Sequence, residues 1–74
     1  MRHDPDATVL VTVNGEPRKV PPATSVADLL DRLGRHPRTV AIEHNGEILP
    51  RDRYGGTVLG TGDRVEIVGF VQGG

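Results

Sequence analysis

One segment of the chain has helical periodicity, and it is flanked on both sides by segments that alternate like β-strands. In ATSVADLLDRLGRHP four apolar residues recur at the i, i+3, i+4 and i+7 spacing of one helix face. They are Val26, Leu29, Leu30 and Leu33. Ser25 and Asp28 have the spacing of a capping box, while Gly34 and then Pro37 predict where the helix ends. Because one helix covers only one face of a sheet, the other face is expected to be uncovered.

The flanking segments predict strands joined by tight turns. TVLVTVNGEPRKV alternates around an Asn-Gly pair, which predicts a hairpin with strands at about 8–14 and 16–21. RTVAIEHNGEILP repeats this pattern, one helical turn is expected near 52–54, and RVEIVGFV is the last strand. The order β-β-α-β-β-β predicts an α+β fold of the β-grasp (ubiquitin-like) type. It has a mixed sheet of four to five strands, one main helix packed on one face, and the first and last strands side by side at the centre.

We predict three parts in the chain: a flexible leader over residues 1–7, the folded domain over 8–70, and a flexible tail over 71–74 that ends in Gly-Gly. In the last strand Val68 and Phe70 alternate with the core positions, so they are expected on the uncovered face. Leu10 and Ala41 are expected on the same face. These four residues form either a partner-docking patch next to the tail or a set of scattered, individually exposed apolar residues.

Composition excludes several classes of function. The chain has 9 Lys+Arg, 10 Asp+Glu and 3% aromatic residues, so it lacks the basic stripe and stacking platform of a nucleic-acid-binding module. It has no cysteine, which excludes disulfides and thiolate chemistry. No apolar run is long enough for a membrane span, and the start lacks a signal-peptide apolar region, so we expect a cytoplasmic protein that does not bind membranes.

No set of side chains predicts catalysis, a metal site or a permanently bound cofactor. His3, His36 and His44 lack metal-ligand spacing, and Asp28 and Asp31 are explained by the solvent face of the helix. The GTGDR segment precedes a strand instead of opening a helix, which makes it a turn and not a phosphate loop. The prediction is therefore a protein that is not an enzyme.

Basic residues gather in two segments, RLGRHPR and PRDR. They comprise Arg32, Arg35, His36, Arg38, Arg51 and Arg53. They are either solvated loops next to a helix end whose dipole favours cations, or a surface that docks on an acidic partner.

The terminal pair Gly73-Gly74 follows the last strand closely. A terminal carboxylate reacts with sulfur or amine nucleophiles only after activation, for example by adenylation. Val71, Gln72 and Gly73 would then thread a partner's active site. The whole arm from Val71 to Gly74 has a reach of at most ~13–14 Å, and the glycines let the backbone approach closely. Ordering this arm costs ~4–8 kcal/mol, which a nearby apolar docking patch can offset. The alternative is a ragged end without function.

The stretches VTVNGEPRKV, TSVADLLDRLG, VAIEHNGEILPRDRY and GDRVEIVGFVQGG together resemble the ThiS sulfur carriers of the ThiS/MoaD group of ubiquitin-like proteins, over about residues 9–74. The third stretch is the most specific, and FVQGG lacks the proline-rich segment that is usual in MoaD-like chains. The longer leader and Gln72 depart mildly from the family pattern.

The resemblance implies that a ThiF-like adenylyltransferase uses ATP and Mg²⁺ to adenylate the Gly74 carboxylate. Sulfur from a cysteine desulfurase system then converts it to a thiocarboxylate, which donates sulfur to thiazole synthase, ThiG, in thiamine biosynthesis. The alternatives are a MoaD-like subunit of molybdopterin synthase, a ubiquitin-like modifier joined to lysines through Gly74, and an interaction domain with an inert tail.

Overall fold

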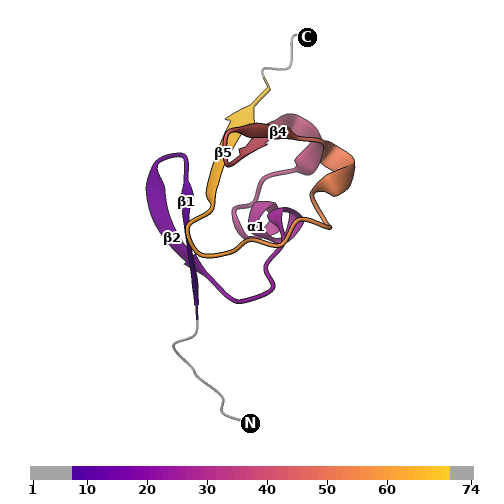
Figure 1. Cartoon of the computed structure of the whole chain (residues 1–74). Helices are drawn as coiled ribbons and strands as arrows, with labels where there is room; N and C mark the ends of the chain where they lie inside the picture. The colour runs from indigo at the N-terminus through magenta and orange to yellow at the C-terminus, as the bar shows by residue number, and fades with distance from the viewer. Residues whose placement is uncertain (1–7, 71–74) are drawn as a thin grey trace.

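The computed structural model describes residues 8–70 and shows a sheet of five strands with one α-helix (Figure 1). Two short 3-10 helices, η1 and η2, lie in the connections. In chain order the elements are β1 (Val9–Val13), β2 (Glu16–Val20), α1 (Val26–Arg32), η1 (Pro37–Thr39), β3 (Val40–His44), β4 (Glu47–Leu49), η2 (Arg51–Arg53) and β5 (Arg64–Gly69). The predicted order of elements is thereby confirmed, and the 3-10 helix η2 lies near the single helical turn expected at 52–54.

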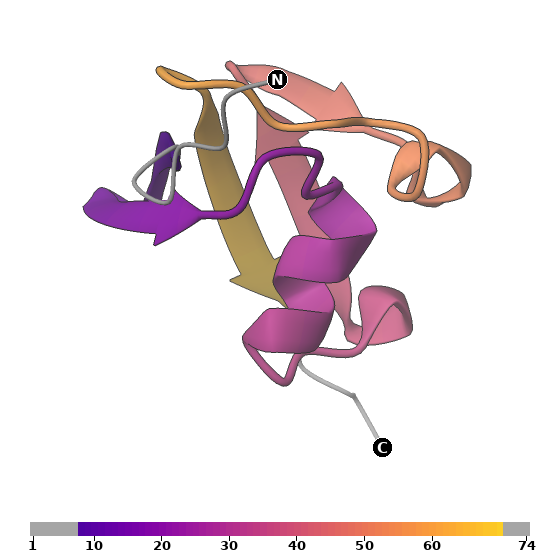
Figure 2. The same cartoon turned by 90° about the horizontal axis from the view of Figure 1, so that it is seen from below.

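The sheet has the order β2-β1-β5-β3-β4, so the first and last strands are neighbours at its centre. They run parallel, with Thr12 opposite Arg64 and Val13 opposite Val65, whereas the other pairs are antiparallel. A parallel pair needs a long crossover, which the hairpin, helix and β3–β4 segment supply. Figure 2 shows α1 crossing one face of the sheet. The mixed sheet with one covering helix confirms the predicted β-grasp class.

Helix α1 begins and ends through the residues that the sequence indicated. The Ser25 hydroxyl accepts a hydrogen bond from Asp28 N at 3.0 Å, and the Asp28 carboxylate accepts one from Ser25 N at 3.1 Å. At the other end Gly34 has φ +69°, a left-handed conformation that glycine adopts without strain. Gly34 N donates to Asp31 O, and Arg35 N donates to Leu30 O. These two bonds form a Schellman motif, which fixes the backbone of Arg35 directly after the helix.

The two Asn-Gly turns have the positive φ values expected of hairpins, with 51° at Asn14 and 54° at Asn45. Asn14 has a second role that the turn pattern does not predict. Its side-chain amide accepts a hydrogen bond from Ile67 N at 2.7 Å and donates one to Ile67 O at 3.2 Å. The side chain therefore continues the β1–β5 pairing beyond the end of β1 and attaches the hairpin turn to β5.

The core lies between α1 and the covered face of the sheet, and it is aliphatic except for one aromatic ring. Its fully buried members with the largest side chains include Val11, Val20, Val26, Leu29, Leu30, Val40, Ile42 and Val65. Tyr54 is 4% exposed, and its hydroxyl donates to Val40 O at 3.4 Å. This contact satisfies the polar end of the tyrosine inside the apolar core.

Four strand boundaries differ from those expected. The first strand begins at Val9, not at 8, the first two strands end one residue earlier than 14 and 21, and the last strand ends at Gly69, not at 71. The first two end sooner because the Asn-Gly turn and Pro21 interrupt the ladder. The predictions for the leader, residues 1–7, and the tail, residues 71–74, lie outside the described residues.

Candidate functional site

The uncovered sheet face has an apolar group at the C-terminal end of β5. Val68 is opposite Ala41 on β3; Val68 is exposed, Ala41 is half-buried, and both are on the face of the sheet away from α1. Val68 is 56% exposed and Phe70 is 49% exposed. Phe70 N donates to Thr39 O at 2.9 Å, which holds the chain against η1 just beyond the strand. The structure thus brings together three of the four predicted patch residues.

Leu10 lies apart from the other three, which divides the predicted patch. It is on the same face and 45% exposed, but its carbonyl accepts a hydrogen bond from Gly62 N. In the parallel register Leu10 is therefore level with Gly62, and Val68 is six residues further along. At about 3.3 Å per residue, this separation is about 20 Å. The alternation of side chains along a strand predicts which face of the sheet a residue is on. Only the register between neighbouring strands decides how far apart two residues lie along that face.

Ile48 is an exposed apolar residue that the sequence analysis did not select. It is on β4, opposite Glu43 of β3, and is 80% exposed. Strand alternation offered a signal, because Leu49 is half-buried and its neighbour in the strand must point outward. We name the surface formed by Ala41, Ile48, Val68 and Phe70 the outer apolar patch.

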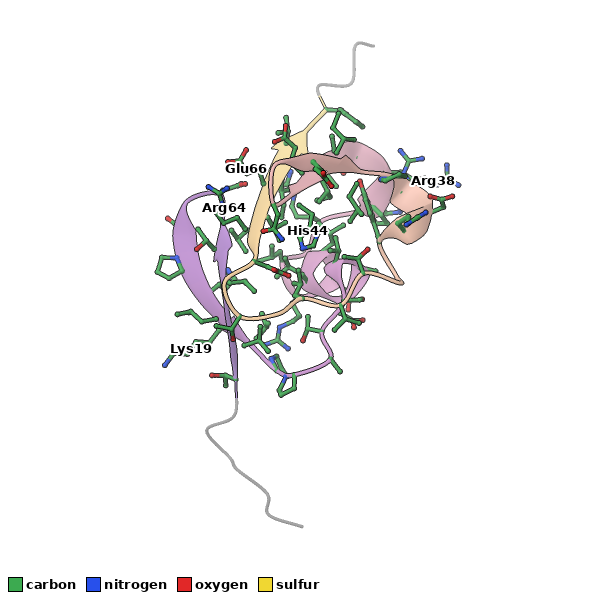
Figure 3. The ribbon with its side chains drawn as sticks, in the orientation of Figure 1. Lys19, Arg38, His44, Arg64 and Glu66 are labelled. Atoms are coloured by element: carbon green, nitrogen blue, oxygen red, sulfur yellow. The ribbon has the colours of Figure 1, made fainter. Side chains whose placement is uncertain are left out.

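Two acidic residues lie beside this outer apolar patch. Glu43 on β3 and Glu66 on β5 are directly opposite each other, and both are exposed (Figure 3 labels Glu66). Like charges opposite each other across a strand pair are destabilising. A partner that brings a cation to this position would relieve that repulsion.

His44 belongs to a polar cluster that closes the opposite end of β5. Its Nε2 lies 3.0 Å from Asp63 Oδ2, and Asn45 Nδ2 donates to Asp63 Oδ1 at 3.2 Å. Gly60 N also donates to Asp63 Oδ2, at 2.9 Å. Partial burial alone would raise the pKa of Asp63, but the hydrogen bonds from Gly60, His44 and Asn45, with the charge of His44, lower it overall. The cluster fixes the turn before β5.

The remaining polar residues considered in the sequence have structural surroundings. The Asp28 carboxylate caps α1, Asp31 is exposed on that helix, and His36 Nδ1 accepts a hydrogen bond from Arg38 N. The GTGDR segment forms the turn that leads into β5. Among residues 8–70 there is no group of three potential metal ligands. No helix of that same region is long and apolar enough to cross a membrane.

The sheet order, with its parallel central pair and its single helix, defines the class of the protein as β-grasp, or ubiquitin-like. The model of the ThiS family matches residues 11–74. The chain therefore belongs to the ThiS family.

Solved structures agree with this membership. The chain is similar to the crystal structure of a thiamine biosynthesis protein (ThiS) from Geobacter metallireducens, with a TM-score of 0.74 and 38% identity. That match covers 89% of this chain and 100% of the other. A solution structure of a thiamine biosynthesis protein from the same organism gives a TM-score of 0.71 over 89% of this chain and 88% of the other.

Curated relatives include two proteins named thiazole synthase. One from Paramagnetospirillum magneticum is 41% identical and one from Magnetococcus marinus is 39% identical, each over 64 residues and 86% of this chain. The chain spans about a fifth of the length of these relatives, since each match covers 20% of the longer protein. An uncharacterized protein, ycf40, from Porphyra purpurea is 33% identical over 89% of this chain and 93% of its own length.

The residues predicted to carry the chemistry lie outside the part that the structure describes. They are Gly74 as the sulfur acceptor, with Val71, Gln72 and Gly73 as the segment that threads a partner site. Their roles stay predictions. The described structure provides the position from which residues 71–74 continue, next to Phe70 and the outer apolar patch.

Proposed function

We propose that this protein is a sulfur carrier of thiamine biosynthesis, with the carboxylate of Gly74 as the sulfur acceptor. The observation that carries the proposal is the match to the ThiS family over residues 11–74, which includes the Gly73-Gly74 pair. The apolar residues around Phe70 support it, because they offer a docking surface close to the segment that must enter a partner's active site.

The chemistry proceeds in three steps, which begin with adenylation by a partner enzyme of the ThiF type. The Gly74 carboxylate attacks the α-phosphorus of ATP, held with Mg²⁺, and pyrophosphate leaves, which produces an acyl adenylate. Sulfur that a cysteine desulfurase system supplies as a persulfide then attacks the acyl carbon, and AMP leaves. A thiol reductant cleaves the resulting acyl disulfide and leaves the thiocarboxylate. The carrier contributes the acyl group and its delivery, and it is a cosubstrate.

A thiazole synthase, ThiG, is the proposed acceptor of the sulfur. The two relatives named thiazole synthase support this partnership, because a region similar to this chain belongs to the same polypeptide in each of them. After transfer the carrier returns to the plain carboxylate. A MoaD-like role would use the same thiocarboxylate on a different acceptor, and a modifier role would use the acyl adenylate to join Gly74 to lysines.

Mass spectrometry of the intact chain tests the proposal. Incubation with a ThiF-type enzyme, ATP, Mg²⁺ and a cysteine-derived sulfur source is expected to give the mass for one oxygen replaced by sulfur. A chain that lacks Gly74 is the matched control and is expected to keep its mass. An unchanged mass of the full chain, with an enzyme that is active on its own carrier, would contradict the proposal.

The acceptor is tested with the thiocarboxylate form. Addition of a thiazole synthase with its small-molecule substrates is expected to restore the carboxylate mass and produce a thiazole. Sulfur transfer to a molybdopterin precursor instead would favour the MoaD-like alternative, and lysine adducts that need Gly74 would favour the modifier.

A further inference from the structure

A groove lies on the helix side of the sheet, at the end of β5 that leads to residues 71–74. Val13, Leu33 and Ile67 form its apolar floor, and Arg18 and Arg35 lie at its rim. Its volume is about 210 Å³, smaller than the roughly 300–1,000 Å³ of small-molecule sites. A groove of this size accommodates one or two side chains and not a cofactor.

The two arginines reach this groove from different elements. Arg18 alternates with the buried Val20 on β2, so its side chain is on the helix side of the sheet. The Schellman motif fixes the backbone of Arg35 at the C-terminal end of α1. The two segments are far apart in sequence, and both arginines line the same groove.

Arg35 also lies against Gly69, at the end of β5 from which the C-terminal segment continues; we call this position the root of the C-terminal segment. A Cβ placed on Gly69, the last residue of β5, would lie 3.0 Å from Arg35 Nη2. The guanidinium therefore covers the backbone of Gly69 on the helix side, while Val68 and Phe70 are exposed on the other side. A partner group bound by Arg35 would lie directly beside the position from which residues 71–74 continue.

The positive charge at this end lacks carboxylate partners within the described chain. Among residues 8–70, His44 and Asp63 form the ion pair that lies within 4.0 Å. Neither Arg18 nor Arg35 therefore forms an ion pair with a carboxylate of that region. The two basic sequence segments also meet at this end, since Arg51 Nε donates to Pro37 O at 3.3 Å. Glu16 is the acidic residue that lines the groove, together with the two arginines.

We propose that Arg18 and Arg35 hold a carboxylate side chain of the adenylating partner enzyme, and that an adjacent apolar side chain of that enzyme fills the groove. The proposal rests on the proposed function, because it needs an enzyme that receives the C-terminal segment. Guanidinium groups bind carboxylates through two parallel hydrogen bonds, which gives the contact a defined geometry. The outer apolar patch and this groove then hold the partner on both sides of the root of the C-terminal segment.

A charge-reversal pair with a matched control tests this contact. The variant Arg18→Glu/Arg35→Glu is compared with Lys19→Glu/Arg64→Glu, which changes the net charge equally. Lys19 and Arg64, both labelled in Figure 3, alternate with the buried Val20 and Val65, so their side chains are on the face of the sheet opposite to the groove. All four side chains are exposed, so both variants are expected to fold, which amide NMR spectra verify.

The assay is ATP–pyrophosphate exchange by a ThiF-type enzyme with increasing concentrations of each chain. We expect the groove variant to raise the KM for the carrier at least about tenfold while kcat is nearly unchanged. We expect the control variant to stay within about twofold of the wild type. The KM of the groove variant is also expected to fall as the salt concentration rises, whereas that of the wild type rises, because charge reversal replaces an attraction by a repulsion that salt screens. Arg35→Lys, which keeps the charge but not the bidentate geometry, is expected to give an intermediate KM.

Equal KM values for the groove and control variants would overturn the proposal. No exchange with the wild-type chain would instead remove the proposed function, and this contact with it. The chain's own terminal carboxylate is the alternative occupant of the groove. If it were bound there, deletion of Gly73 and Gly74 would shift the Arg35 side-chain NMR signals in the free protein, and this result too would overturn the proposal.

Discussion

Replacement of Phe70 by alanine tests whether the outer apolar patch docks on a partner. Phe70 is 49% exposed, and a buried aromatic side chain covers 150–250 Å² in general. About 100 Å² of its surface is therefore available to a partner. At about 25 cal/mol per Å², complete covering would contribute at most about 2.5 kcal/mol to binding. With incomplete covering, we expect Phe70→Ala to weaken binding about 10- to 60-fold.

The measurement is calorimetric titration of each variant into a ThiF-type enzyme and, separately, into a thiazole synthase. Leu10→Ala is the matched control, because Leu10 is 45% exposed on the same face but is about 20 Å from Val68 along the sheet. We expect Leu10→Ala to change the Kd less than twofold. The free energy of unfolding of Phe70→Ala is expected to fall by less than about 1 kcal/mol, since the ring is not part of the buried core.

Two results would refute the reasoning about the outer apolar patch. An unchanged Kd for Phe70→Ala with both enzymes would remove the docking role of this surface. Equal losses for Phe70→Ala and Leu10→Ala would show that position along the face does not matter, which contradicts a patch located at the end of β5.

Three further predictions concern stability, each measured by urea unfolding. Because the pKa of Asp63 is lowered in the folded state, its carboxylate stabilises the fold above its ordinary pKa of 3.8, and this contribution disappears as the pH falls through the lower folded value. Asp63→Asn should therefore unfold more easily at neutral pH and lose part of the acid dependence of the wild type; an identical pH profile would contradict this. Asn14→Gly keeps the turn conformation but removes both bonds to Ile67, so it should cost about 1–3 kcal/mol, and a cost near zero would show that the amide does not hold the turn. Ser25→Ala should cost about 1 kcal/mol through loss of the cap to Asp28, and Ser25→Asp, which preserves an acceptor, should cost less.

The sequence by itself determined the local structure of this protein. The Ser25–Asp28 capping box, Gly34 after the helix and the two Asn-Gly turns each work through contacts between residues close in the chain, so their patterns predicted the elements correctly. Alternation also predicted that Val68 and Phe70 are exposed beside the end of β5, because a strand has only two faces. The order of the elements was then sufficient for the β-grasp class, since one helix and one parallel central pair leave few arrangements.

Only the tertiary structure decided which distant residues meet. The parallel register of β1 with β5 separates Leu10 from Val68, although both are on one face. The same packing joins His44 to Asp63 and brings Arg18 and Arg35 to one groove. No periodic pattern in the sequence predicts these pairs. Each pair depends on the register between two elements that are distant in the chain, and the packing of the whole core sets that register. The C-terminal glycines were recognisable in the sequence, whereas the charged groove beside their root required the folded chain.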